Sequence, residues 1–272
     1  MHAQTSTPFL DQVLPAIDSV AARITTLLSG VVDPAVVVPA SPGWTVHDVA
    51  AHLVTVVGRY SDGPEGRGTW TPTPVELPAL NDVQLATLGD STVEELSTQL
   101  HHELTRLAAQ IRGYGNAPPS FRFHGQEPIR ADVALGALLG ELAVHGRDIA
   151  KALHQPWPIH PHHAALIIEG ISPILPGWVR PERIRGFNAT FEIRLRGEAT
   201  HIWVFRDGRV DINPPTVEVR TFDAHISGDP ASVLLVFYGR ETQWKQIATG
   251  RMLAWGRKPW LALTLTSRFH SP

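Results

Sequence analysis

Apolar residues recur every three to four positions in several segments of the first half of the chain, and this spacing predicts amphipathic helices. We expect four helices, over Phe9–Leu28, Thr45–Tyr60, Ser91–Ile111 and Ala131–Leu153. Thr45 and Asp48 have the spacing of a capping box at the start of the second helix. Ser91 and Glu94 repeat that spacing at the start of the third. Four helices of this kind predict an antiparallel four-helix bundle.

The connections between these helices are rich in proline and glycine. Residues 61–90 contain four prolines and predict a long loop. Long loops in compact domains often carry function, so this one is a candidate lid over a site as well as an ordinary surface loop. Residues 113–129 predict a second loop, in which Phe121, Phe123 and His124 could line a pocket.

The pattern changes after Leu153. Proline brackets Trp157 in a stiff linker, so we place a domain boundary there, giving residues 1–157 and 158–272. In the second part, alternating apolar positions predict mostly antiparallel strands, with a helix before them and a short helix after them. The expected elements are a helix over Ala164–Leu175, strands over Ala189–Leu195, His201–Phe205, Val210–Ile212 and Val217–Phe222, and a helix over Ala231–Tyr238 capped by Asp229. The predicted fold class is therefore α+β, with an N-terminal bundle and a smaller C-terminal α/β domain.

Composition limits the chemistry. The 272 residues include no cysteine, so any metal must be held by nitrogen and oxygen atoms, and any thiol chemistry needs a thiol from outside the chain. A net charge of −3 gives no basic surface for nucleic acid or anionic lipid. No apolar run has the length of a membrane span, and the first residues do not resemble a signal peptide. We therefore expect a cytoplasmic protein that binds neither nucleic acid nor membrane.

One helix face carries the strongest candidate site. Glu141 and His145 are four residues apart, so an α-helix stacks their side chains where both can reach one metal ion, and Asp148 continues that face. His52 lies among apolar residues of the second helix and should point to the interior. Each feature also has an ordinary explanation: Glu/His pairs occur on solvated helix faces, and a histidine on an apolar face can be a hydrogen-bonded core residue.

Other histidines have weaker claims. His101 and His102 lie on the third helix, where we expect a partly exposed pair. His160, His162 and His163 form a cluster that could bind metal adventitiously, but the start of a helix explains it as well.

Two segments together resemble a known family. PGWTVHDVAAHL, at residues 42–53, and GELAVHGRDIAKAL, at residues 140–153, are similar to motifs of the mycothiol-dependent maleylpyruvate isomerase family, a branch of the DinB-like metal-binding four-helix bundles. The resemblance implies that His52, Glu141 and His145 bind a divalent metal, usually taken to be zinc. It also implies a low-molecular-weight thiol of the mycothiol type as cosubstrate.

The C-terminal segment from Ile226 resembles the sterol-carrier-like α/β domain that accompanies the bundle in this family. Members of the family place this domain so that a basic residue can reach the metal cleft. That resemblance makes Arg240, Arg251 and Arg257 candidate catalytic residues.

Two imidazoles and one carboxylate leave a zinc ion with an open fourth position. We expect a zinc-bound thiolate to attack an electrophilic small molecule, in an S-transferase or a cis-trans isomerase reaction, with Asp148 orienting a ligand histidine. One alternative is a thiol-independent hydrolase that uses zinc-bound water. Another is a carrier of apolar ligands, with a cavity lined by Phe191, Trp203, Phe205, Leu234 and Phe237.

Overall fold

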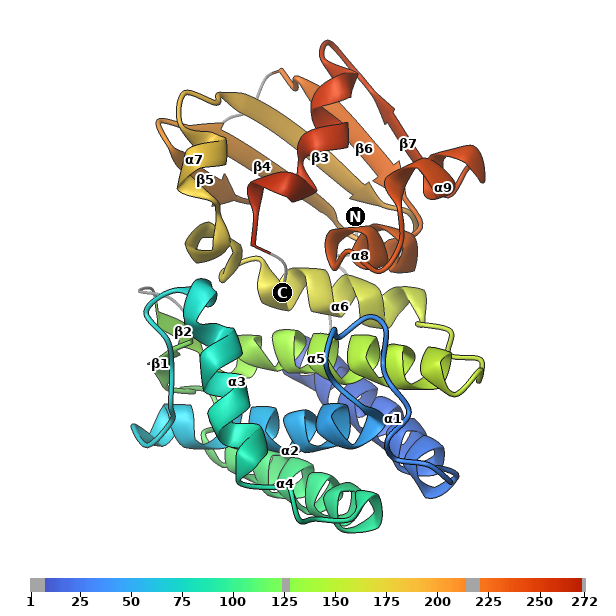
Figure 1. The fold of residues 1–272 in the computed structure, drawn as a ribbon. Helices are drawn as coiled ribbons and strands as arrows, with labels where there is room; N and C mark the ends of the chain where they lie inside the picture. Colours follow the sequence, from blue (N-terminus) through green and yellow to red (C-terminus); the bar gives the residue numbers. More distant parts are fainter. Residues whose placement is uncertain (1–7, 124–127, 214–220, 271–272) are drawn as a thin grey trace, which may run out of the picture. The chain divides into compact units, whose positions relative to one another are not determined.

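The computed structural model describes residues 8–123, 128–213 and 221–270. The chain divides into two compact units, Met1–Ile159 and His160–Pro272. The first is helical and the second contains a five-stranded sheet, so the α+β fold class is confirmed (Figure 1). Within the described ranges, no helix combines the length and apolar character needed to cross a membrane.

Four long helices build the N-terminal unit, as the apolar spacing predicts. They are α1 (Phe9–Ser29), α2 (Val46–Asp62), α4 (Val93–Gly113) and α5 (Ala131–Ala152). α5 packs against α1 and α2, and α4 packs against the same two helices from the other side of the bundle. Most residues of α5 are buried, and Leu138, Leu139 and Leu142 are fully enclosed.

The helix starts follow the capping signals. Thr45 caps α2 and forms the expected box with Asp48. α4 begins one residue later than expected, because Thr92 and Glu95 form the box instead of Ser91 and Glu94. The sequence offers two hydroxyl residues followed by two glutamates in the same spacing, so the pattern alone allows either register.

The prediction that residues 61–90 form a loop is wrong for the middle of this segment. The segment contains α3 (Leu77–Ala86) and two 3-10 turns, Gly63–Glu65 and Pro74–Glu76. Three of its four prolines, Pro64, Pro74 and Pro78, lie in the first turns of these elements, where a missing amide hydrogen costs nothing. α3 buries none of its residues, so no apolar pattern marks it in the sequence.

The second connection also contains regular structure. β1 (Ser120–Arg122) and β2 (Pro128–Arg130) pair in antiparallel fashion, so the loop predicted there is only partly correct. Phe121 is buried, and the ring of Phe123 lies 4.8 Å from that of Tyr60. His124 lies outside the described residues.

After α5 the chain folds back onto the bundle. Trp157 donates from Nε1 to the carbonyl of Ala143 at 3.1 Å, and its ring covers Gly146. Arg23 of α1 lies 4.1 Å from the centre of the Trp157 ring and donates to the carbonyl of Pro158 at 3.0 Å. These contacts fasten the linker to α5 and α1.

Replacing Gly146 with alanine is expected to lower the free energy of unfolding by about 1–3 kcal/mol. A Cβ at Gly146 would lie 2.5 Å from Cζ2 of Trp157, so the indole would have to move. The matched control is Gly58→Ala in α2, where nothing lies within 4 Å of the added Cβ and alanine should be neutral or stabilising. Urea unfolding followed by tryptophan fluorescence measures both; equal stability of the two variants would contradict the packing argument.

The C-terminal unit is built on one sheet. Its strands are β3 (Ala189–Leu195), β4 (Thr200–Arg206), β5 (Arg209–Ile212), β6 (Ala224–Gly228) and β7 (Met252–Trp255), in the order β5-β4-β3-β6-β7. β3 and β6 are parallel and the other neighbours antiparallel, so the mostly antiparallel prediction is confirmed. In the strand predicted over 217–222, residues 217–220 lie outside the described residues and 221–222 form no strand.

Short helices accompany the sheet. They are α6 (Pro161–Ile171), α7 (Pro181–Ile184), α8 (Pro230–Phe237), α9 (Gln243–Ala248) and the 3-10 helices Leu175–Trp178, Pro259–Thr264 and Thr266–Arg268. α6 starts earlier than predicted because His160 caps it, accepting from the amide of His162 at 3.2 Å, with Pro161 in the first turn. This histidine cluster is therefore a helix start. Asp229 caps α8, as expected.

A cavity of about 50 Å³ lies in this unit. Of the five residues expected to line an apolar cavity, Trp203 and Phe237 do so. The other three, Phe191, Phe205 and Leu234, are fully buried in the core. The likeness of this unit to sterol-carrier domains stays a prediction.

Candidate metal centre

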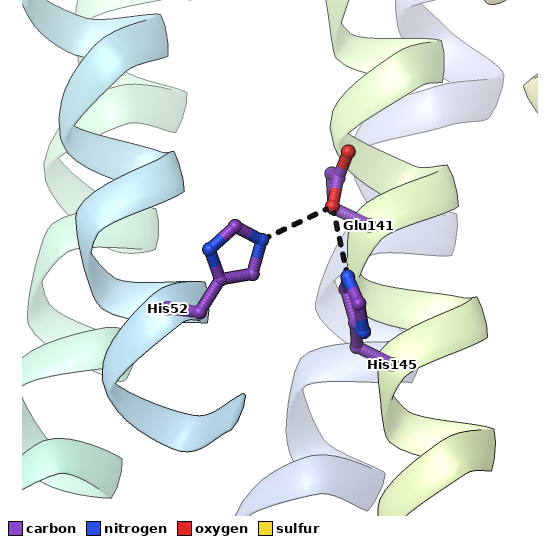
Figure 2. A group of neighbouring side chains, drawn as sticks. All are labelled: His52, Glu141 and His145. Atoms are coloured by element: carbon purple, nitrogen blue, oxygen red, sulfur yellow. Dashed lines mark ion pairs between the residues drawn. The ribbon is translucent and has the colours of Figure 1, made fainter. Parts of the chain in front are cut away.

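Three polar side chains converge where α2 faces α5 (Figure 2). Oε2 of Glu141 lies 3.6 Å from Nε2 of His52 and 3.3 Å from Nε2 of His145. One donor atom from each residue lies within 4.8 Å of the other two. In the part of the chain that the structure describes, no other three histidine or carboxylate side chains meet in this way.

The local sequence explains why His52 points at α5. The capping box at Thr45 fixes where α2 begins, and Val49 and Leu53 are fully buried on the bundle side. His52 shares that side and is 5% exposed. Its ring lies between two others, 4.9 Å from that of Trp44 and 5.1 Å from that of His145. Trp44 therefore helps to hold the imidazole in place.

The protonation states suit a divalent cation. Burial lowers the pKa of His52 to about 4, so its imidazole is neutral at neutral pH. Burial alone would raise the pKa of Glu141, but the adjacent imidazoles of His145 and His52 outweigh it and hold that pKa well below its usual range. A carboxylate and neutral imidazoles are the forms in which these side chains bind metal.

The spacing of the donor atoms also fits a metal. Zinc bonds of about 2.0–2.1 Å in a tetrahedron place neighbouring ligand atoms about 3.4 Å apart. Two of the three separations, 3.3 and 3.6 Å, bracket that value, and all three are within 4.8 Å. The Glu141 side chain keeps 27% of its surface exposed, which leaves the centre open on one side. The residues present therefore fit a divalent metal ion with a free position.

Asp148 lies directly behind the site. It is 1% exposed, and its Oδ2 is 3.6 Å from Nδ1 of His145. Nδ1 of His145 is buried and has no hydrogen-bond partner within 3.5 Å. A small shift of either group would bring Nδ1–H onto the carboxylate and leave Nε2 free for a metal.

Arg59 is a residue that the sequence analysis missed. It lies on α2 two turns beyond His52 and is 6% exposed. Its guanidinium donates to Gln84 at 2.8 Å and to Asn81 at 2.6 Å, both on α3. Burial lowers the pKa of Arg59, and attraction to the Glu141 carboxylate opposes that shift. The sequence signal that could have identified Arg59 is its charge seven positions after His52, on the same apolar helix face.

Hydrogen bonds from Arg59 of α2 hold α3, which lies in the segment predicted as a candidate lid. Replacing Arg59 with methionine is expected to weaken the attachment of α3 by about 1–3 kcal/mol, because hydrogen bonds from a charged group are lost. Limited proteolysis and hydrogen exchange across residues 63–90 measure the loosening. Arg67→Met is the control, since Arg67 is 60% exposed in the same segment. Equal protection of α3 in both variants would show that Arg59 does not hold it.

The remaining candidates are on other elements of the fold. His101 and His102 are exposed on α4. Arg240, Arg251 and Arg257 belong to the C-terminal unit, where Arg240 donates to the carbonyl of Tyr238 at 2.9 Å and the other two are exposed. Their role at the metal centre stays a prediction.

Comparison with known families gives the site a context. Residues 17–150, which include all three converging side chains, match the family model described as the mycothiol maleylpyruvate isomerase N-terminal domain. Through this domain the chain belongs to the mycothiol maleylpyruvate isomerase family. The resemblance predicted from the two sequence motifs is thereby confirmed.

Solved structures related to this family share the fold. A crystal structure of the mycothiol-dependent maleylpyruvate isomerase is 13% identical and has a TM-score of 0.53 over 89% of this chain and 94% of that one. A mutant of that enzyme is 14% identical, with a TM-score of 0.52 over 89% of this chain and 93% of the other. The likeness covers most of both units. No curated protein matches the chain.

Proposed function

We propose that this protein is a thiol-dependent metalloenzyme of the maleylpyruvate isomerase type. Its site would bring a mycothiol-type thiol and an electrophilic small molecule together at His52, Glu141 and His145. The observation that carries the proposal is the set of donor atoms 3.3 and 3.6 Å apart, at the spacing of a tetrahedral zinc site, in a domain of this family.

A bound divalent ion, which we propose is zinc, would favour the thiolate form of an incoming thiol at neutral pH. His52, Glu141 and His145 would hold that ion from one side. The exposed side of Glu141 leaves room for the thiol to approach. Asp148 would keep the His145 ring in the orientation and tautomer that this binding needs. The chain has no cysteine, so the sulfur must come from a cosubstrate.

The proposed reaction begins with addition. The thiolate sulfur forms a bond to one carbon of an activated cis alkene, and the electron pair of the double bond moves to the activating carbonyl. Rotation about the resulting single bond, followed by loss of the same thiolate, restores the double bond in the trans form. Protonation in place of that loss gives a stable thioether, which is the S-transferase outcome. The family favours isomerisation.

Maleylpyruvate and mycothiol provide the direct test, with formation of the trans isomer followed by ultraviolet absorbance. The expected rate requires the thiol, falls on removal of metal by a chelator and returns when zinc is added. His52→Ala should abolish most of it, whereas His102→Ala, a change at an exposed position on α4, should not. Equal formation of the trans isomer without thiol would overturn the proposal, whereas loss of maleylpyruvate without thiol and without formation of the trans isomer would favour metal-assisted hydrolysis.

A further inference from the structure

Exposed apolar side chains gather at one edge of the C-terminal sheet. Within the described residues, β7 ends the sheet, with β6 on one side and no strand on the other (Figure 1). In the same part of the chain eight large apolar side chains are strongly exposed, and half of them lie on β7 or on two helices that contact it. They are Leu253 and Trp255 of β7, Trp244 of α9 and Trp260 of the 3-10 helix Pro259–Thr264. Apolar side chains gathered at an exposed edge are typical of an interaction surface.

The outer side of β7 also presents main-chain groups. The carbonyl of Arg251 accepts from the amide that follows β6 at 2.9 Å, so Arg251 belongs to a hydrogen-bonded pair at the start of the ladder between β6 and β7. Such pairs alternate along an antiparallel ladder, so Leu253 and Trp255 bond to β6 as well. The amides and carbonyls of Met252 and Ala254 therefore point away from β6, where a further strand can bond to them.

The side chains of β7 divide between the two faces of the sheet. Met252 lines the cavity of this unit, so Arg251, Leu253 and Trp255 share the opposite face. On that face Leu253 is 53% exposed, Trp255 is 39% exposed, and Arg251 is exposed too. The strand thus offers a cation, an aliphatic side chain and an indole in sequence, each two residues from the next.

This pattern is self-complementary when a second copy of β7 runs antiparallel beside the first. The outward main-chain groups of Met252 then bond to those of Ala254 in the second copy, and the reverse. In this register the two Leu253 side chains lie opposite each other on a two-fold axis. Arg251 of each copy lies opposite Trp255 of the other, so apolar side chains meet at the centre and the two cations stay apart.

The neighbouring registers are less favourable. Because the outward main-chain groups repeat every two residues, the second copy can shift only in steps of two. One step places Arg251 opposite Arg257 of the second copy, and like charges directly opposite each other are destabilising. A step in the other direction places Trp255 opposite Thr249, which lies outside β7. Charge and strand length together favour the register with Leu253 at its centre.

We propose that two copies of this chain associate through β7, paired antiparallel with Leu253 on the two-fold axis. The pairing joins two five-stranded sheets into one continuous sheet and covers exposed apolar side chains on both copies. It involves neither the metal centre nor the thiol reaction.

Sedimentation equilibrium of the full chain tests the association. The average mass is expected to rise from 29.8 kDa towards twice that value as the protein concentration increases. Leu253→Lys places two ammonium groups opposite each other on the axis, so this variant should stay monomeric. Val83→Lys is the control, because Val83 is 68% exposed on α3, and it should associate like the parent chain. A parent chain that is monomeric up to about 1 mM would overturn the proposal, leaving Arg251 and Arg257 as charges that protect the edge.

Cysteine substitution tests the register, since the chain has no cysteine of its own. The two Leu253 residues would form a non-hydrogen-bonded pair, whose Cα atoms lie about 4.5 Å apart, within reach of a disulfide. Leu253→Cys is therefore expected to form a disulfide-linked dimer when diamide is added as oxidant. Ser227→Cys is the matched control: Ser227 lies beside Leu253 on β6, so its two copies would be three strand spacings apart, about 14 Å.

The exposed Val83→Cys variant gives the rate of cross-linking by random collision. Cross-linking of Leu253→Cys no faster than that of Val83→Cys would overturn the proposal, because another surface or register would then join the copies. Neither measurement depends on the metal or the thiol, so failure here leaves the proposed enzyme function unaffected.

Discussion

Glu141→Ala is expected to weaken zinc binding by at least about a hundredfold. Loss of a group that only hydrogen-bonds to a metal-binding side chain already costs about 10–100-fold in metal affinity, and Glu141 would bind the metal directly. The carboxylate is the one anionic donor of the three, and both imidazole Nε2 atoms face its Oε2. Without it, two imidazoles remain. Zinc affinity is measured by competition with a chromophoric chelator, and zinc content by elemental analysis of the purified protein.

A matched control distinguishes the loss of a zinc-binding carboxylate from the general effect of removing a glutamate that pairs with a histidine. Glu198 lies 3.2 Å from Nδ1 of His162 in the C-terminal unit and is 23% exposed, close to the exposure of Glu141. Glu198→Ala should keep the zinc content of the parent protein, because no third histidine or carboxylate side chain among the described residues meets that pair. If Glu141→Ala retained one tightly bound zinc while staying folded, the three-residue site would be wrong.

Asp148→Asn is expected to weaken zinc binding by about 10–100-fold with little effect on folding. Asparagine has the same shape, but its neutral oxygen attracts the Nδ1 proton of His145 less strongly than a carboxylate does. His145 would then be a weaker and less well oriented ligand. The same chelator competition measures the change, and thermal unfolding of the metal-free protein checks that the fold is intact.

The control for this variant is on the same helix. Asp132 is 14% exposed near the start of α5 and pairs with Arg130 at 2.6 Å, away from the metal centre. Asp132→Asn should leave zinc affinity unchanged. A similar loss of affinity in both variants would mean that the negative charge of α5, and not the contact between Asp148 and His145, determines binding.

The parts of this fold that the sequence predicts are those with local causes. The four long helices have strong apolar periodicity, and Thr45 and Asp48 determine the start of α2 within the sequence itself. Glu141 and His145 share a helix face by their spacing alone. That His52 meets them depends on the packing of α2 against α5; its apolar flanks predicted that it points to the interior, and the family resemblance strengthened the prediction of that contact.

The parts that were missed depend on contacts between distant segments. β6 is a short strand with glycine at its end, and it is stabilised by parallel pairing with β3. α3 buries none of its own residues and is held by hydrogen bonds from Arg59. Neither a one-sided apolar pattern nor a capping motif in the sequence therefore predicts it. Local patterns contain no information about such partners.

The packing of Trp157 on Gly146 determines where the two units can be separated. α5 ends at Ala152, but the indole that covers α5 beside His145 comes from the linker beyond it. A bundle cut at the end of the helix would lose that cover and the carbonyl that Arg23 binds. The smallest N-terminal fragment that keeps the indole against α5 beside His145 therefore extends through Pro158.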